Sequence, residues 1–375
     1  NRTPALIYAA DDVLRAVMFW AMWLPLGARV SLDSAFNPRS LNLPQRVFSA
    51  ATLALMVQQC SIYIFSALFK TSSPIWWPDG SAVYYSLSFD QYVTPIGRLF
   101  LNAPPVMTLF NHATLVLEWL GPLLIFVPFR TSFFRTLAVV MFVGLHLGFG
   151  LTLNLGIFPF LSAFTWLAFI PTDTWQRWTK RAFKAPQRGL TIYYDADCGF
   201  CKKVVCLLRT LLVLPDKPAF TAQSDDSICA DMEAQNSWGV GDWQGQRHFK
   251  LEASAYGVSL SPIVRGLAPV LRWEPVMARG TRIYEWIANN RRLMGRFTKP
   301  FKFKDAGVRA PIWANGTVVV LLLLTLAWNF RSFTSHRNFI ESNHPAVKAL
   351  RRVTNSRTLQ TLNPLSRATR LDQSW

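Results

Sequence analysis

The sequence predicts a multi-pass α-helical membrane bundle with one inserted α/β domain, and three observations lead to this fold class. Hydrophobic residues make up 51 % of the 375 positions and charged residues only 16 %, below the roughly 25 % that is typical of soluble domains. Long apolar runs without any charge occupy residues 47–69 and 312–330. Between residues 172 and 311 such runs stop and charges return, so we expect a water-soluble domain there.

Each apolar run is a candidate membrane-spanning helix. The two uncharged runs are long enough to cross a hydrocarbon core of about 30 Å, and the other runs are shorter or contain a polar residue. The six predicted spans are residues 16–28, 47–69, 104–129, 136–153, 155–171 and 312–330. The predicted domains are a five-helix membrane domain at 1–171, the inserted domain at 172–311, a sixth helix at 312–330 and a basic tail at 331–375.

The charge distribution identifies membrane lipid, and not nucleic acid, as the expected partner. The net charge is +18, but no nucleic-acid recognition motif accompanies it. Basic residues instead flank the apolar runs, as is usual where a membrane protein meets anionic lipid. Placing the basic groups at residues 29–46, 130–135, 177–188 and 299–309 on the cytoplasmic side also places the inserted domain in the cytoplasm.

The strongest site signal is the pair Cys198 and Cys201 at the start of the inserted domain. An apolar run at residues 190–194 predicts a strand, and the apolar periodicity of residues 202–214 predicts a helix. A helix N-terminus favours the thiolate, so Cys198 is the expected nucleophile. Two intervening residues let Cys201 resolve a mixed disulfide. This order of strand, Cys-x-x-Cys and helix matches the start of a thioredoxin-like unit.

Two other interpretations of this pair stay open at this point. Cys-x-x-Cys is also half of a zinc site, which Cys206, Cys229 or His248 would have to complete. The sequence contains no second Cys-x-x-Cys and no Cys/His pair, so we predict no metal. The two cysteines could also be structural and unreactive.

The string from Tyr193 to Cys201, Tyr-Tyr-Asp-Ala-Asp-Cys-Gly-Phe-Cys, resembles the Asp-x-x-Cys-x-x-Cys signature of the DCC family of thiol-disulfide oxidoreductases. The resemblance covers about residues 187–300 and departs from the family pattern at Ala196, where the family commonly has glycine. It implies a thioredoxin-like fold in which the two cysteines exchange electrons and Asp195 helps to handle protons.

The membrane part resembles a second family, the HTTM domain of vitamin K-dependent gamma-carboxylases and of bacterial proteins that help to mature exported peptides. The resemblance rests on short strings that begin at Asp11, Leu26, Trp77, Leu117 and His146, and on the string from Arg370 to Trp375. It implies an integral protein of the bacterial inner membrane. A carboxylase also needs a strong base, a lysine in that family, and Lys70, the one lysine before residue 171, does not match it.

Two polar residues within predicted spans, Glu118 and His146, form a second candidate site. A charge in the bilayer is costly and usually functional, and these residues lie on adjacent spans where they could pair. Asn111, His112 and Asn154 could line the same cavity. The alternative is that these groups only hydrogen-bond between helices and fix the bundle. The cofactor class expected for such a site is a quinone or another lipid-soluble electron carrier.

These observations support three functional hypotheses. The first is a membrane-bound thiol-disulfide oxidoreductase in which Cys198 attacks, Cys201 resolves and Asp195 assists. The second is a non-catalytic accessory subunit or maturation factor of a larger membrane complex or of an exported peptide. The third is a carboxylase-like enzyme.

Overall fold

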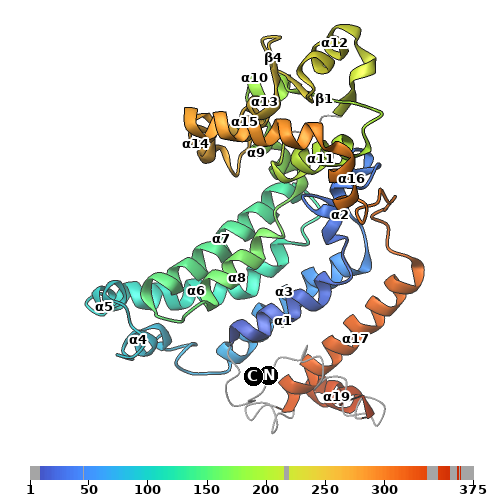
Figure 1. Cartoon of the computed structure of the whole chain (residues 1–375). Coiled ribbons are helices and arrows are strands. Elements are labelled where there is room, and N and C mark those ends of the chain that lie inside the picture. Colours follow the sequence, from blue (N-terminus) through green and yellow to red (C-terminus); the bar gives the residue numbers. More distant parts are fainter. Residues whose placement is uncertain are drawn as a thin grey trace. The chain divides into compact units, whose positions relative to one another are not determined.

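The computed structural model describes residues 9–44, 46–214, 219–335, 345–354, 361–362 and 364. The chain divides into two compact units (Figure 1). The helical unit comprises Asn1–Leu24, Val47–Trp175 and Arg309–Trp375, and the α/β unit comprises Pro25–Arg46 and Gln176–Val308. The string at 370–375 lies outside the described residues.

The helical unit consists of long helices joined by short ones. Its bundle helices are α1 (Ala9–Ala21), α3 (Ala50–Thr71), α6 (Pro104–Leu124), α7 (Thr131–Thr152), α8 (Phe158–Leu167) and α17 (Ile312–Ser335). Its short helices are α4 (Ala82–Leu87), α5 (Pro95–Phe100) and α19 (Pro345–Thr354). Ser49 begins α3, because its hydroxyl accepts the backbone N–H of Thr52 and so satisfies a donor that the helix leaves unpaired.

Among the described residues, three helices and not six are both long and apolar enough to cross a membrane, namely α3, α7 and α17. The prediction of about six spans therefore exceeds what length and composition support. The polar residues Asn111, His112 and Glu118 lower the mean hydropathy of α6. Helix α8 has only 10 residues, and α1 ends at Ala21 because Pro25 disfavours helical geometry ahead of it.

Aromatic side chains form the centre of the helical unit. Trp166 on α8 and Phe142 on α7 are fully buried, and their rings stack with centroids 4.1 Å apart. Tyr63 on α3 packs against both rings. A second buried cluster joins α1 to α17 and α3 through Trp20 and Val318. Close packing of these faces fixes how the helices of this unit lie against one another.

The α/β unit contains a four-stranded sheet in the order β2-β1-β3-β4. Its strands are β1 (Thr191–Tyr194), β2 (Ala219–Thr221), β3 (Gly239–Gly241) and β4 (Arg247–Phe249). Strand β1 pairs parallel with β2, whereas β3 pairs antiparallel with both β1 and β4. Helices α11 (Gly199–Leu211), α12 (Asp226–Gln235) and α13 (Lys250–Leu260) follow β1, β2 and β4. Because parallel strands need a crossover connection, α11 has to pass over one face of the sheet.

The core of the α/β unit explains why α11 is held firmly. Ile192 and Tyr194 of β1 are buried and alternate with half-buried neighbours, which is the period-2 pattern of a strand with one face in the core. They share a buried cluster with Val205 of α11 and Val240 of β3. The remaining helices are α9 (Thr172–Ala182), which enters this unit, α10 (Ala185–Gly189), α14 (Ala268–Arg272), α15 (Glu274–Asn289) and α16 (Arg291–Phe297).

The polar connection between α1 and α3, here called the 25–46 segment, belongs to the α/β unit, although the predicted inserted domain began only at residue 172. Its helix α2 (Leu32–Ala35) packs against α11. The side-chain amide of Asn37 donates to the carbonyl of Ala306, 269 residues away, at 2.8 Å. Because one folded unit lies on one side of a membrane, this segment and the inserted domain share a side.

Candidate functional site

The disulfide between Cys198 and Cys201 lies at the start of α11, directly after β1. The two Cα atoms are 5.2 Å apart, within the usual range for disulfides. Cys198 is the N-cap residue, and its Sγ accepts the backbone N–H of Cys201 at 3.2 Å. Both cysteines are half-buried. The sulfurs therefore lie where the positive end of a helix stabilises a thiolate, as the strand–pair–helix pattern predicted.

Asp195 holds the turn between β1 and the disulfide. Its carboxylate accepts the backbone N–H of Asp197 at 3.0 Å and the side-chain N–H of Gln223 at 3.3 Å. Its backbone carbonyl accepts the N–H of Cys198 at 3.3 Å. These contacts position the turn, whereas its part in proton handling stays a prediction. Gln223 was missed by sequence reasoning, because its partner lies 28 residues away.

Two lysines directly after the disulfide are anchored within the same unit. The Nζ of Lys203 donates to the carbonyl of Thr298 at 2.7 Å. The Nζ of Lys202 lies 5.1 Å from the centre of the Phe303 ring. Both lysines add positive charge to the first turn of α11, where the helix dipole already favours an anion. A thiolate released from the disulfide would therefore be stabilised at this place.

A cavity of about 550 Å³ lies between the 25–46 segment and the chain that precedes α17. Phe36 and Phe301 stack beside it with ring centroids 5.5 Å apart. Phe36 also contacts Phe303, the ring that Lys202 covers, so contacts run from this cavity to the first turn of α11. Its volume is in the range of ligand pockets. Its lining combines apolar and charged side chains, among them Leu32, Asp33, Phe36, Phe301, Lys302 and Lys304.

The other three cysteines do not complete a metal site with this pair. Burial raises the pKa of the Cys206 thiol, and burial together with nearby Glu233 raises that of Cys229. Both are therefore poor nucleophiles. Cys60 is buried in the helical unit. Among the described residues, no group of three or more Cys, His, Asp and Glu is arranged to hold a metal.

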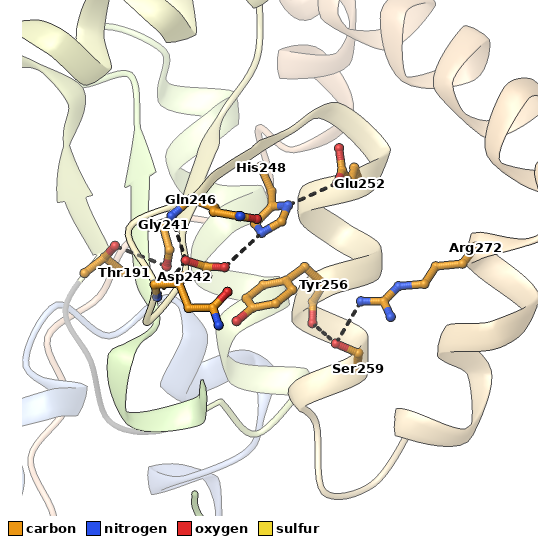
Figure 2. A network of polar contacts seen from close by, with 10 residues as sticks. Thr191, Gly241, Asp242, Gln246, His248, Glu252, Tyr256, Ser259 and Arg272 are labelled. Atoms are coloured by element: carbon orange, nitrogen blue, oxygen red, sulfur yellow. Dashed lines mark hydrogen bonds and ion pairs between the residues drawn. The ribbon is translucent and has the colours of Figure 1, made fainter. Parts of the chain in front are cut away.

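His248, considered for zinc on sequence grounds, belongs instead to a polar network at the other end of the sheet (Figure 2). Its Nε2 lies 3.6 Å from the carboxylate of Asp242, and its Nδ1 lies 3.1 Å from that of Glu252. Its ring stacks on Tyr256 at 4.5 Å between centroids. The turn after β3 lies beside Thr191, the first residue of β1, whereas the disulfide follows the last. The network is thus separate from the disulfide.

Asp242 organises the turn between β3 and β4. Desolvation alone would raise the pKa of its carboxyl, but the backbone N–H groups of Gln246 and Gln244 and the imidazole of His248 outweigh it, so the pKa lies below its ordinary value. The two N–H donors lie 2.7 and 2.8 Å from one carboxylate oxygen. A turn held in this way braces the sheet, so we assign the network a structural role.

In the helical unit the predicted pairing of Glu118 with His146 is wrong. Glu118 is buried on α6 and forms an ion pair with Lys70 at the end of α3. The Nε2 of His146 lies 2.7 Å from the hydroxyl of Tyr63, which also accepts the indole N–H of Trp166 at 2.8 Å. Each polar group thus finds its own partner, because α3 packs near both. In the described part of the chain, Glu118 Oε2 and His146 Nδ1 are buried without a hydrogen-bond partner.

A cavity of about 510 Å³ lies among α4, α5, α6 and α7, and nearly all of its lining side chains are apolar. Trp76 is part of this lining, and the Nζ of Lys70 lies 4.6 Å from the centre of its ring. The Lys70–Glu118 pair is therefore next to the cavity. The five polar residues predicted to form one site do not line it; they are Asn111, His112, Glu118, His146 and Asn154.

Comparisons with known proteins identify no relative of this chain. No family model, no curated protein and no solved structure matches it. The resemblances to the DCC and HTTM families therefore rest on the quoted residues.

Proposed function

We propose that the chain is a membrane-bound thiol-disulfide oxidoreductase whose redox group is the Cys198–Cys201 pair. The observation that carries the proposal is a half-buried disulfide at the N-terminus of a helix, with Lys202 and Lys203 directly after it. The sheet order β2-β1-β3-β4, with α11 after β1 and α13 after β4, supports a thioredoxin-like fold for this unit. This order supports the DCC-family resemblance, which came from other residues.

The proposed reaction transfers two electrons from a dithiol substrate to the disulfide. A substrate thiolate attacks Sγ of Cys198, the S–S bond breaks, and Cys201 leaves as a thiolate. The second substrate thiol loses its proton and attacks the substrate sulfur of the mixed disulfide, which releases Cys198. The substrate ends as a disulfide, and its two protons pass to the two protein thiolates. Asp195, three residues before Cys198, is proposed to take up the proton of the second substrate thiol and to pass it to a protein thiolate. In the reverse direction Cys198 is the thiolate that attacks a substrate disulfide, and Cys201 resolves the mixed disulfide.

Although only α3, α7 and α17 among the described helices are long and apolar enough to cross by length and composition, the proposed membrane topology keeps six crossings, with α1, α6 and α8 crossing beside these three helices. Four crossings then separate the 25–46 segment from residue 176 and return the chain to the same side, as one folded unit requires. We place this side in the cytoplasm of a bacterial cell. The basic residues of the 25–46 segment and of the inserted domain support this orientation.

A lipid-soluble electron carrier, such as a quinone, is the proposed partner that reoxidises the pair. A quinone takes up two electrons and two protons, which balances the step at the two thiols. The apolar cavity of about 510 Å³ supports this choice, since it suits an apolar chain. The Lys70–Glu118 pair beside it would offer polar contacts to the head of such a molecule.

Alkylation of the full chain in membranes, before and after reduction, tests the proposal. We expect Cys198 to be protected before reduction and to react much faster than Cys206 and Cys229 after it. Permeant and impermeant reagents report the side of the membrane. Cys198→Ser should abolish thiol exchange with a dithiol peptide, whereas Cys206→Ser, a control in the same helix, should not. If the pair never changes its redox state, the oxidoreductase proposal is wrong and the accessory role is left.

The carboxylase alternative receives little support from the surroundings of Lys70. A carboxylase base must accept a proton, but this ammonium group is held by the buried carboxylate of Glu118 and lies over the ring of Trp76. Incorporation of labelled carbon dioxide into a peptide that depends on Lys70 would restore this alternative.

A further inference from the structure

One face of α15 exposes apolar and basic side chains together. Ile283 and Trp286 are 60 % and 56 % exposed, and Arg279 and Arg282 are exposed beside them. Spacings of three and four residues place all four on one side of the helix. The other side is fixed in the unit, because the hydroxyl of Tyr284 lies 3.0 Å from that of Ser237. The exposed face is therefore a defined surface, which we call the α15 face.

The α15 face lies in the basic part of the α/β unit. Residues 261–308 contain 10 Lys or Arg against 3 Asp or Glu, a net charge of +7, whereas residues 191–260 contain 6 against 9. Two of the three acids are already paired, Glu285 with Lys250 at 2.7 Å and Asp305 with Arg39 at 2.9 Å. The exposed surface of this part therefore complements an anionic partner.

An anionic membrane surface fits this chemistry best. The basic part ends four residues before α17 begins at Ile312, and α17 is long and apolar enough to cross a membrane. A basic cluster beside a spanning helix is attracted to anionic headgroups. Trp and Ile next to arginines suit the boundary between headgroups and acyl chains. Because the unit is tethered to spanning helices, lipid is present at high effective concentration.

We propose that the α15 face docks on the anionic lipid leaflet that adjoins the α/β unit. The arginines contact lipid phosphates, and Ile283 and Trp286 enter the headgroup region. Docking would fix the orientation of the unit relative to the membrane surface, and with it the direction in which the disulfide faces. This proposal does not depend on the redox activity of the cysteines.

Hydrogen exchange of the full chain in nanodiscs tests the docking. The discs contain phosphatidylcholine alone or phosphatidylcholine mixed with phosphatidylglycerol, and the readout is the protection of the peptide that covers residues 279–289. We expect stronger protection in the anionic discs, and weaker protection at high salt. Each basic residue near an anionic surface contributes roughly a fivefold preference for that surface. Arg279→Gln/Arg282→Gln should therefore reduce the preference of the α15 face for anionic over neutral discs by about 25-fold.

Two controls separate docking from misfolding and from protein binding. Arg279→Lys/Arg282→Lys keeps the charge and should keep most of the protection. The peptide around Ala253, which is fully buried in the core, should exchange equally slowly in every variant. Equal protection in neutral and anionic discs would overturn the proposal. So would protection that arises only when a soluble protein is added, which would assign the face to a protein partner.

Discussion

The buried ion pair between Lys70 and Glu118 allows an asymmetric prediction. The side chain of Glu118 is 5 % exposed and that of Lys70 is 19 % exposed. Lys70→Met leaves a carboxylate without its partner in a dry interior, and breaking a buried pair in this way costs about 3–5 kcal/mol. We therefore expect Lys70→Met to lower the free energy of unfolding by an amount near the middle of this range.

Glu118→Gln should lower the free energy of unfolding by less, about 1–2 kcal/mol. The Lys70 amine lies in the last turn of α3, and from there its long side chain can reach solvent. The double variant should resemble Glu118→Gln and not the sum of the two losses, since no charge then remains buried.

Thermal unfolding of the purified chain in detergent, followed by circular dichroism, measures these differences. At roughly 2–4 °C per kcal/mol, Lys70→Met should lower Tm by about 10 °C and Glu118→Gln by about 5 °C. Equal losses in the two single variants, or fully additive losses in the double variant, would refute the ion pair as the stabilising contact.

Three further predictions concern other contacts. Gly97→Ala would push its new methyl group into the backbone carbonyl of Thr152 and should destabilise the helical unit by about 1–3 kcal/mol. In the same melting assay Gly316→Ala should not destabilise the unit, because nothing lies within 4 Å of the added methyl group and alanine favours the helix. Gln223→Ala removes an amide that holds the turn before the disulfide and should lower the unfolding free energy by about 1 kcal/mol in urea titration. The folded state lowers the pKa of Asp242. Its carboxylate therefore stabilises the fold above about pH 4, and this stabilisation is lost as the pH falls. In a plot of Tm against pH, Asp242→Asn should make the decline at acid pH less steep.

Local patterns in the sequence were sufficient to predict the position of the cysteine pair and the helix that follows it. The apolar run before Asp195 and the periodicity after Cys201 predicted a strand and a helix, and these elements are β1 and α11. This prediction succeeded because strand, thiol pair and helix follow one another within about twenty residues. The two long uncharged runs likewise correspond to α3 and α17, because length and apolarity alone define such helices.

Contacts between distant parts of the chain could not be predicted in the same way. A pairing of Glu118 with His146 was considered because their spans adjoin in sequence, but each contacts a residue of α3 instead, Lys70 or Tyr63. Which helix lies against which is decided by side-chain packing, as in the stack of Trp166 on Phe142. This packing cannot be derived from one sequence alone.

The 25–46 segment shows how the chain joins the two units. The chain passes between the two units at four places, before Pro25, Val47, Gln176 and Arg309, whereas a simple insertion would have two. Helix α2 lies in the short connection that follows α1, and it packs against α11, which begins at the disulfide. Helix α11 is therefore linked to the helical unit through its packing partner α2, which lies in the same connection that follows α1, as well as through the ends of the inserted domain.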